Sequence, residues 1–456
     1  MADIGTLSSL GLGSNGALNY DIIDKLKKAD QEAIITPIEN KIDLDKKRED
    51  ALADLTTQLS MLKGDASSLS YDSLYLKVTT DISGSSATAT VQDGVPSQTI
   101  DLNVTNIATN DVKESKAFSS QDSTFTSGAD TLKFELASGD SFSIDVDDTT
   151  TITDLAQKIN DNSNGKITAS ILNVGGDNPY KLIIKSTETG ADNAITVSST
   201  GGGTAADDLS LTTVGDGAQD ANFTYNGVSI TRSSNDISDL INGVDIKLVN
   251  SGVTTIKISQ DTESIKDSVK SFIKNYNDLV DNLKDLTKYD TETKQTGIFQ
   301  GVSQVSDIKN ELNNIIFNLD SSGKSLSNFG ITLNSADHLE LDETVLDNKL
   351  QNNPEEVRDF FKGNTTTNPN DGLFVQLNND LNSLFLNQDS PLKLYSSYLD
   401  NKLRDLEDEK DSQTKKLDSK YEILAKKFAA YDTIIASYNN QAQSIQMQID
   451  SMATKK

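Results

Sequence analysis

The C-terminal part of the chain carries apolar side chains at alternating spacings of three and four residues, and it holds neither glycine nor proline between residues 392 and 452. This spacing is typical of a helix that packs along a second helix. One extra step of four residues before Tyr421 is a stutter, which locally relaxes a supercoil. The predicted contact positions on this helix are Leu399, Leu403, Leu406, Leu417, Leu424, Phe428, Tyr431, Ile435 and Tyr438.

A second heptad pattern lies near the N-terminus. The run Thr36-Pro37-Ile38-Glu39 predicts a helix start with a capping box and with proline as the first helical residue. A short helix is predicted before it, from Asn19 to Asp30, and a third heptad pattern after Asp261 predicts a partner helix for the two terminal ones. The contact positions predicted on the longer N-terminal helix are Leu52, Leu55, Leu59 and Leu62.

The middle of the chain is rich in β-branched residues and glycine, which predicts strands and turns. Alternating apolar and polar residues predict one hairpin over residues 132–136 and 142–146 and a second strand pair over 167–171 and 181–185. Thr153 is predicted to cap a short helix between them, and residues 229–246 weakly repeat this unit. Further helices are predicted over residues 302–319, 354–361 and 373–386, the second of them capped by Asn353 with Glu356.

These patterns predict an α+β fold in which long terminal helices form a coiled-coil-like helical domain, with antiparallel β-rich domains inserted in the middle of the chain. The helical leg comprises residues 37–74 and 261–456, and its extreme C-terminus is expected to be mobile in the isolated protein. A first β-rich head domain comprises 75–116 with 218–260, and 117–217 form a second one inserted into it. Residues 1–36, with several glycines and few apolar side chains, are predicted to be a mobile tail.

Composition and charge exclude several classes of function. The formal net charge of −28 argues against binding to nucleic acid or to anionic membranes, because both would repel the chain. The absence of Cys and the single His remove most support for zinc ribbons, disulfide scaffolds, cysteine nucleophiles and Ser-His-Asp triads. No apolar run reaches the length of a signal-peptide core or a membrane span. We therefore expect no enzyme activity, no cofactor, no metal and no membrane insertion.

Two glycine-containing segments match parts of nucleotide-binding motifs. Gly11, Gly13 and Gly16 fit the dinucleotide fingerprint, but that motif requires a preceding strand, and the ten residues before Gly11 are mostly small or polar. The run Gly323-Lys324-Ser325 resembles the end of a phosphate-binding loop, yet the earlier glycine position holds Asn318. A flexible tail and a surface turn are the better interpretations.

Acidic residues give two further candidates for chemistry. His338 lies among carboxylates and could form half of an acid–base pair, although a solvated hairpin residue fits the pattern better. Asp145, Asp147 and Asp148 could ligate a cation, but the spacing and central glycine of a calcium loop are absent, so turn carboxylates are the better interpretation. The 69 acidic residues keep a hydrolase with a carboxylate pair as a minor alternative.

Several segments, taken in order, resemble the flagellar filament-capping protein family, also called hook-associated protein 2. Near the N-terminus the resemblance rests on residues 9–14 (SLGLGS), on Asp21-Ile22-Ile23, on Ala29-Asp30 and on Pro37. In the C-terminal half it rests on residues 221–228 (ANFTYNGV), 234–235, 241–244 and 272–277, and on 326–331 and 339–342 followed by Leu346, Leu350, Pro354, Val357 and Phe361. Residues 125–197 are similar to a small module that recurs in flagellin and hook proteins.

The resemblance implies a structural protein that is exported without a cleaved signal peptide through the flagellar type III apparatus. It implies a ring-like cap of about five copies at the extracellular tip of the filament, where flagellin folds and inserts. The implied partners are flagellin, the hook-filament junction protein, and a cytosolic export chaperone at the C-terminus. The helix contact positions named above would then serve contacts between copies or with the filament.

Two alternatives stay open at this stage. Flagellin or the hook-filament junction protein would share helical ends around a β-rich middle, but residues 326–361 resemble caps only. A secreted adhesin for cell adhesion would use the β-rich domains as its binding surface, and the absence of Trp leaves few aromatic side chains for a sugar platform.

Overall fold

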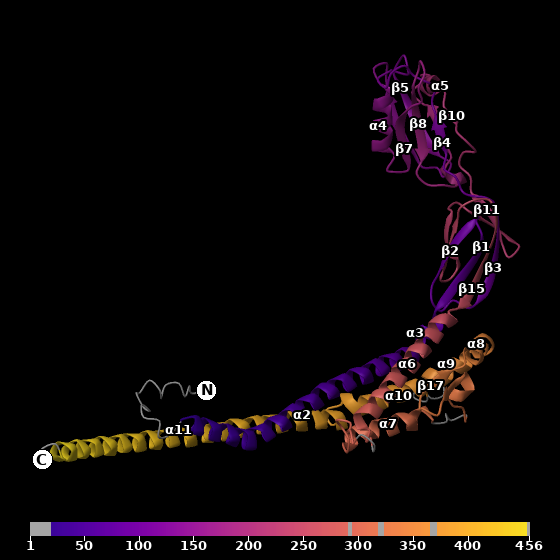
Figure 1. Ribbon diagram of the computed structural model, residues 1–456. Helices are drawn as coiled ribbons and strands as arrows, with labels where there is room; N and C mark the ends of the chain where they lie inside the picture. The colour runs from indigo at the N-terminus through magenta and orange to yellow at the C-terminus, as the bar shows by residue number, and fades with distance from the viewer. Residues whose placement is uncertain (1–19, 291–293, 318–322, 365–371, 454–456) are drawn as a thin grey trace. The chain divides into compact units, whose positions relative to one another are not determined.

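The computed structural model describes residues 20–290, 294–317, 323–364 and 372–453 (Figure 1). The chain forms two compact units, a helical one built from residues before 72 and after 265, and a β-rich one built from Asp72–Ile265. Long helices at both ends of the chain and antiparallel sheets in its middle confirm the predicted α+β class. The finer predicted division, with boundaries at residues 37, 75, 117, 218 and 261, stays a prediction.

The helical unit consists of the two long terminal helices and a group of shorter ones between them. A small hairpin of two strands, β16 and β17, joins this group. The elements are α2 (Tyr20–Ser70), α6 (Thr262–Thr287), α7 (Ser303–Ile316), β16 (Ile331–Leu333), β17 (Leu339–Leu341), α8 (Glu343–Asn352), α9 (Pro354–Lys362), α10 (Leu373–Leu381), a π-helical turn (Asn382–Leu386) and α11 (Pro391–Ala453).

Aromatic side chains fill the core of the helical unit. The ring of Phe374 on α10 meets Phe272 of α6 edge-on at 4.9 Å between ring centroids, and it meets Phe361 of α9 in the same way at 5.0 Å. Along α6, Val269, Phe272 and Tyr276 are fully buried, which confirms that the third heptad pattern forms a packed helix face. These contacts give α10 and α6 fixed positions beneath the terminal helices.

The N-terminal helix begins at Tyr20, so the prediction of a helix start at Pro37 is wrong, whereas residues 20–30 of the predicted short helix are helical and form the first part of the same helix. The mobility predicted for residues 1–36 stays a prediction. Pro37 lies inside the helix, where it cannot donate to the carbonyl of Ala33 and where such a proline costs about 3 kcal/mol. Burial offsets this cost, because Ile23 and Ile35 pack against Leu417 of α11. Residues 1–19, the rest of the predicted tail, lie outside the described residues.

Two predicted helix caps are also corrected by the structure. The helix at Ile152–Asn162 is capped by Thr151 rather than Thr153, because Asp154 at the third helical position completes a capping box with Thr151. Asn353 precedes Pro354 as predicted but makes no side-chain cap, and the Glu356 carboxylate pairs with Lys324 and Lys349. Cap residues compete with nearby cations, and the sequence does not show which interaction wins.

The β-rich unit contains two separate hydrophobic cores, the first of which lies between two sheets. One sheet has the strand order β1-β15-β3-β11-β12 and the other β13-β14-β2, and every pairing within them is antiparallel. A short helix, α3 (Asp72–Leu76), precedes them. The strands are β1 (Val78–Gly84), β2 (Ala87–Val91), β3 (Gln98–Asn106), β11 (Ala221–Tyr225), β12 (Val228–Arg232), β13 (Asp236–Ile241), β14 (Val244–Leu248) and β15 (Gly252–Gln260).

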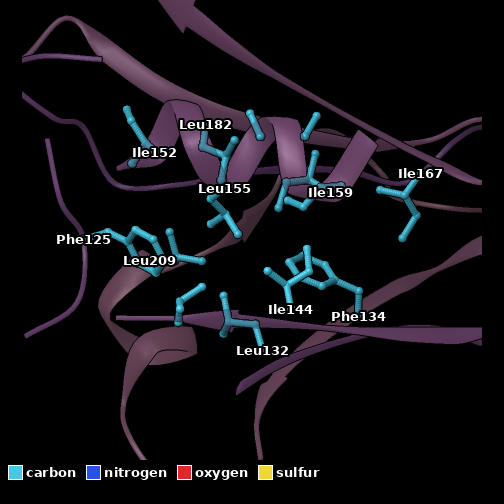
Figure 2. Close-up of a cluster of buried hydrophobic side chains, with 14 of the residues drawn as sticks. Phe125, Leu132, Phe134, Ile144, Ile152, Leu155, Ile159, Ile167, Leu182 and Leu209 are labelled. Atoms are coloured by element: carbon cyan, nitrogen blue, oxygen red, sulfur yellow. The ribbon is translucent and has the colours of Figure 1, made fainter. Parts of the chain in front are cut away.

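The second core lies among residues 118–209 and also has two sheets, with the orders β10-β4-β8-β7 and β6-β5-β9. Figure 2 shows Leu155 and Ile159 of α4 facing Leu132 and Phe134 across this core. Both predicted strand pairs are confirmed, with β5 on β6 and β7 on β8. The elements are β4 (Val112–Glu114), β5 (Asp130–Leu136), β6 (Ser141–Val146), α4 (Ile152–Asn162), β7 (Ile167–Asn173), β8 (Tyr180–Ser186), a 3-10 turn (Ala191–Asn193), β9 (Ile195–Ser199), α5 (Ala205–Leu209) and β10 (Thr212–Thr213).

The predicted repeat of this unit at residues 229–246 is not a structural repeat. The segment that matches the start of α4 in sequence lies in strand β13, which pairs with β14. Ile237 is buried in this strand and Leu240 and Ile241 are half-buried, so these residues pack as part of a sheet and not on a helix face. The local similarity therefore reflects a shared short sequence and not a shared fold.

A buried carboxylate, Asp130, holds the loop that leads into α5. Its two oxygens accept hydrogen bonds from the backbone N–H groups of Thr131 at 2.8 Å, Gly201 at 3.1 Å, Gly203 at 3.3 Å and Ala205 at 3.0 Å. A Cβ atom on Gly201 would lie 2.6 Å from the Thr131 nitrogen, so this close wrapping requires glycine. A hydrogen bond from Ser199 and these backbone donors lower the pKa of Asp130 from 3.8 to about 2.

We predict that Asp130→Asn destabilises the β-rich unit at neutral pH and that this effect fades in acid. Because folding lowers the carboxyl pKa, its contribution is complete above pH 3.8 and is lost as the pH falls through about 2. Unfolding by denaturant at pH 7, 4 and 2 measures the difference between the two proteins. Asp161→Asn, at an exposed position on α4, is the control. A difference that stays constant down to pH 2 would contradict this role.

Candidate assembly interface

The two terminal helices, α2 and α11, pack against each other in opposite directions (Figure 1). Three ion pairs fix the direction, because ascending positions on α2 meet descending positions on α11. Lys27 lies 2.8 Å from Asp418, Glu39 lies 2.9 Å from Lys410, and Asp45 lies 2.8 Å from Lys402. The pairing that the heptad patterns suggest is therefore made within one chain.

Apolar layers lie between these ion pairs. One cluster packs Ile38 and Ile42 of α2 against Leu403 and Leu406 of α11. A second cluster joins Ile23 and Ile35 to the α11 residues Leu417, Tyr421 and Ala425. Burial of these side chains is the main favourable term for the helix pair, at about 1.5–3 kcal/mol for each large residue.

The predicted contact residues of α2 are buried inside the helical unit. Leu52, Leu55, Leu59 and Leu62 have exposed fractions between 0 and 5%. The helix α2 also packs on α10 and α9. These leucines therefore stabilise the chain's own fold, and a contact with a second copy at them would require the unit to open.

The predicted contact residues of α11 fall into three groups. Leu399, Leu403, Leu406 and Leu417 are buried, and Leu424 and Phe428 are half-buried beside the cluster that contains Ile23. Ile435 is half-buried as well. Tyr431 and Tyr438 are exposed, at 57% and 67%. A contact with another copy or with the filament is therefore expected only at Tyr431, Ile435 and Tyr438, and at these three positions it stays a prediction.

The end of α11 carries an apolar stripe that the described part of the chain leaves exposed. Successive helix residues are about 100° apart, which places six exposed apolar side chains within one narrow sector of the surface. We call this set the terminal stripe: Tyr431, Ile434, Tyr438, Ile445, Ile449 and Met452. Met447 is also exposed but lies on the opposite side of the helix. Heptad spacing alone did not distinguish this stripe from the buried part of α11.

A polar contact lies within the outer part of the paired region. Asp30 on α2 accepts hydrogen bonds from Lys420 and from the Tyr421 hydroxyl, each at 2.7 Å. The Lys420 and Tyr421 hydrogen bonds lower the pKa of Asp30, and the bond to Asp30 raises the pKa of Lys420. This contact helps to place Tyr421 at the edge of the apolar cluster.

Charged residues that the heptad pattern does not predict lie inside the helix pair. Asp45 and Glu49 occupy heptad positions between Ile42 and Leu52, where the apolar pattern is interrupted. Asp45 is buried between Arg48 and Lys402. The interruption of the pattern was the available signal, but without a partner helix it could not show what the carboxylate would meet.

The candidate catalytic and metal-binding residues are explained by local contacts. His338 Nε2 lies 2.7 Å from Asp281, and Asp337 beside it pairs with Lys309 at 2.6 Å, which lowers the Asp337 pKa. Asp147 accepts from Thr149 and Thr150 and shapes the turn before α4. Among the described residues, no group of three or more acidic, His or Cys side chains has the geometry to hold a metal ion.

The nucleotide-motif candidates offer no site either. Lys324 pairs with Glu356 at 2.7 Å, so its ammonium is used within the fold. Gly11, Gly13 and Gly16 lie outside the described residues. No described helix is long and apolar enough to cross a membrane.

Comparison with known proteins gives matches to family models in both the N-terminal and the C-terminal parts of the chain. Residues 16–111 match the model of the flagellar hook-associated protein 2 N-terminus, and residues 218–440 match that of its C-terminus. The chain belongs to the flagellar hook-associated protein 2 family. The C-terminal match includes α6 to α10 and the paired part of α11 together with the start of the terminal stripe.

Relatives match along most of the chain. The flagellar hook-associated protein 2 of Helicobacter pylori strain J99 is 26% identical, with 99% of this chain and 100% of that protein covered. The Campylobacter jejuni protein of the same name is 32% identical over 419 residues, covering 79% of this chain and 65% of that protein. A crystal structure of the flagellar cap protein FliD from Escherichia coli, comprising domains D1 to D3, superposes with a TM-score of 0.52 at 25% identity, covering 76% of this chain and 99% of that one.

We predict opposite responses at two positions of α11. Leu403→Ala should lower the free energy of unfolding by about 2–5 kcal/mol, because it leaves a cavity beside Ile42. Tyr438→Ala should change it by less than about 0.5 kcal/mol, because the ring is exposed. Urea unfolding followed by circular dichroism at 222 nm measures both. Ala429 is buried and Tyr431 is exposed, which places the end of the α2–α11 pairing near residue 429. Equal losses at the two positions would contradict this end point.

Proposed function

We infer that this chain forms the cap at the distal tip of the bacterial flagellar filament, where it promotes folding and insertion of flagellin subunits and prevents their loss. The observation that carries this conclusion is the family assignment, which rests on matches at both ends of the chain. The block at residues 326–361, which distinguished caps from flagellin and junction proteins, lies within the C-terminal match. Among the described residues, no observation favours the adhesin alternative.

We propose that the terminal stripe is the surface that α11 uses in assembly. Its six apolar side chains are exposed in the single chain, and an exposed apolar stripe in water favours a partner that covers it. At the filament tip that partner would be flagellin, the hook-filament junction protein or another copy. Before export it would be the cytosolic chaperone, which would keep the same stripe from aggregating.

The remaining properties follow from this role as proposals. The cap would contain about five copies arranged around a closed axis, since identical subunits close into rings. The chain would leave the cell unfolded through the type III export apparatus, without a cleaved signal peptide, and act outside the cell. It would act by shape and contact alone, as a structural protein and not as an enzyme. The net charge of −28 supports the further proposal that it binds no nucleic acid.

The cell-based test begins with deletion of the gene. We predict non-motile cells that release unpolymerised flagellin into the medium, because exported subunits would have nothing to hold them at the tip. Electron microscopy of the cells and immunoblots of the medium measure both effects. Full-length filaments on the deleted strain would contradict the capping function.

The stripe is tested by complementing that strain. Tyr438→Asp with Ile445→Asp places two charges in the stripe and should fail to restore swimming, because burying an unpaired carboxylate in a contact is costly. Asn440→Asp with Gln443→Asp adds the same charge to the opposite side of the helix and should restore it. Both variants should reach normal levels in the cell. Normal swimming with the first variant would show that the stripe is not a contact surface.

A further inference from the structure

The chain crosses twice between the two cores of the β-rich unit. Residues 107–111 lead from β3 of the first core to β4 of the second, and residues 214–220 lead back from β10 to β11. Midway the two crossing segments pair as an antiparallel bridge, in which the Thr109 N–H donates to the Gln219 carbonyl at 2.9 Å and the Gln219 N–H donates to the Thr109 carbonyl at 3.3 Å. A two-stranded ribbon is only marginally stable by itself, so it would allow the two cores to tilt.

A loop of the second core makes a further contact with the first core. We call residues 187–191, which follow β8, the β8 loop. The Thr189 hydroxyl donates to the Ser233 carbonyl at 2.6 Å, and the Ala191 N–H donates to a carboxylate oxygen of Asp220 at 2.8 Å. Ser233 lies between β12 and β13, outside both crossing segments. The two cores are therefore joined at a second place.

Gly190 makes this contact close. Its N–H donates to the Thr109 carbonyl at 3.0 Å, beside the bridge between the crossing segments. Its φ of +105° lies in the region that favours glycine, and an added Cβ atom would lie 2.5 Å from the Cβ of Ser233 and 2.9 Å from its Cα. A larger residue at this position would push the β8 loop away from Ser233.

Both sides of the contact are held within their own cores. In the second core, the side-chain amide of Asn193 donates to the Thr189 carbonyl at 2.9 Å. In the first core, the side chain of Asn235, two residues after Ser233, accepts from the Ala108 N–H at 2.7 Å and donates to the Ala108 carbonyl at 2.8 Å. The donor loop and the acceptor loop are thus each fixed before they meet.

The hydrogen bonds of the β8 loop act together. A single hydrogen bond that competes with water contributes little to stability. The crossing segments already hold the two surfaces near each other, so these bonds form at a high effective concentration. Thr189, Gly190 and Ala191 are consecutive residues of one short loop, and a tilt of either core would have to break their contacts together.

We propose that the β8 loop braces the two β-rich cores, so that they move as one rigid body. The crossing segments supply the connection, and the contact with Ser233 prevents the bending that a two-stranded ribbon would allow. Gly190 is the residue on which the fit of the loop depends. This inference concerns the isolated chain and does not rest on the capping function.

The distance between two spin labels, one on each core of the full chain, reports this rigidity. The chain contains no Cys of its own. Ser229→Cys on β12 and Asp161→Cys on α4 place the labels at exposed positions outside the contact. Double electron–electron resonance gives the distribution of distances between the labels, and we expect a single narrow distribution in the otherwise native chain.

Gly190→Ala should broaden this distribution by at least about twofold, because the added Cβ separates the β8 loop from Ser233 and releases a range of tilts. Gly139→Ala is the matched control, since Gly139 has a similar φ of +96° and an added Cβ there would meet nothing within 4 Å. This control should leave the width unchanged. Thr189→Val with Asp220→Ala removes two hydrogen bonds across the contact while keeping Gly190, and it should also broaden the distribution.

Thermal unfolding followed by circular dichroism establishes which variants are folded. A folded Gly190→Ala chain with a distribution as narrow as the native one would overturn the proposal. If Gly190→Ala does not fold, Thr189→Val with Asp220→Ala decides in the same way, because it leaves the backbone conformation of the loop unchanged. A broad distribution in the native chain would also overturn it, since the cores would then tilt despite the β8 loop.

Discussion

The antiparallel pairing of α2 with α11 is the contact on which the helical unit depends. It joins residues almost 400 positions apart, since Asp30 meets Lys420 and Tyr421. A contact of this kind has a high entropic cost of closure, so it needs a long apolar face to be stable. The clusters around Ile23 and Ile42 supply that face, and α6 to α10 pack beneath its inner end.

The length of this pairing determines how much of the apolar face of α11 remains exposed. Pairing covers α11 as far as Ala429, and beyond it the helix continues with six exposed apolar side chains. A compact protein would bury or replace these residues, whereas a subunit that must hold a growing polymer needs an apolar face that partners can take up. The proposed use of the terminal stripe in assembly would give the cap function and the unequal lengths of the two helices one physical explanation.

The sequence predicted elements with strong periodicity and failed where two local rules competed. Alternation predicted the β5–β6 hairpin, and heptads predicted α6 and α11. The strong preference of proline for the first turn of a helix predicts a helix start at Pro37, yet burial of Ile23 and Ile35 stabilises the helix through this position. The heptads of α11 predicted its apolar contact face but not which part of that face stays exposed. They continue unchanged past residue 429 and do not show where the pairing with α2 ends. Asp45 could not be interpreted without its partner helix.

Hydrogen exchange along α11 in the monomeric chain tests the central claim most directly. A single helix unsupported by packing opens readily, whereas a helix buried against another exchanges only when the pair opens. We expect slow exchange of backbone amides from residue 399 to residue 425 and fast exchange from residue 434 to residue 450, with a transition near Ala429. Uniformly slow exchange through residue 450 in the monomer would show that the terminal stripe is already covered within one chain, and would contradict the account.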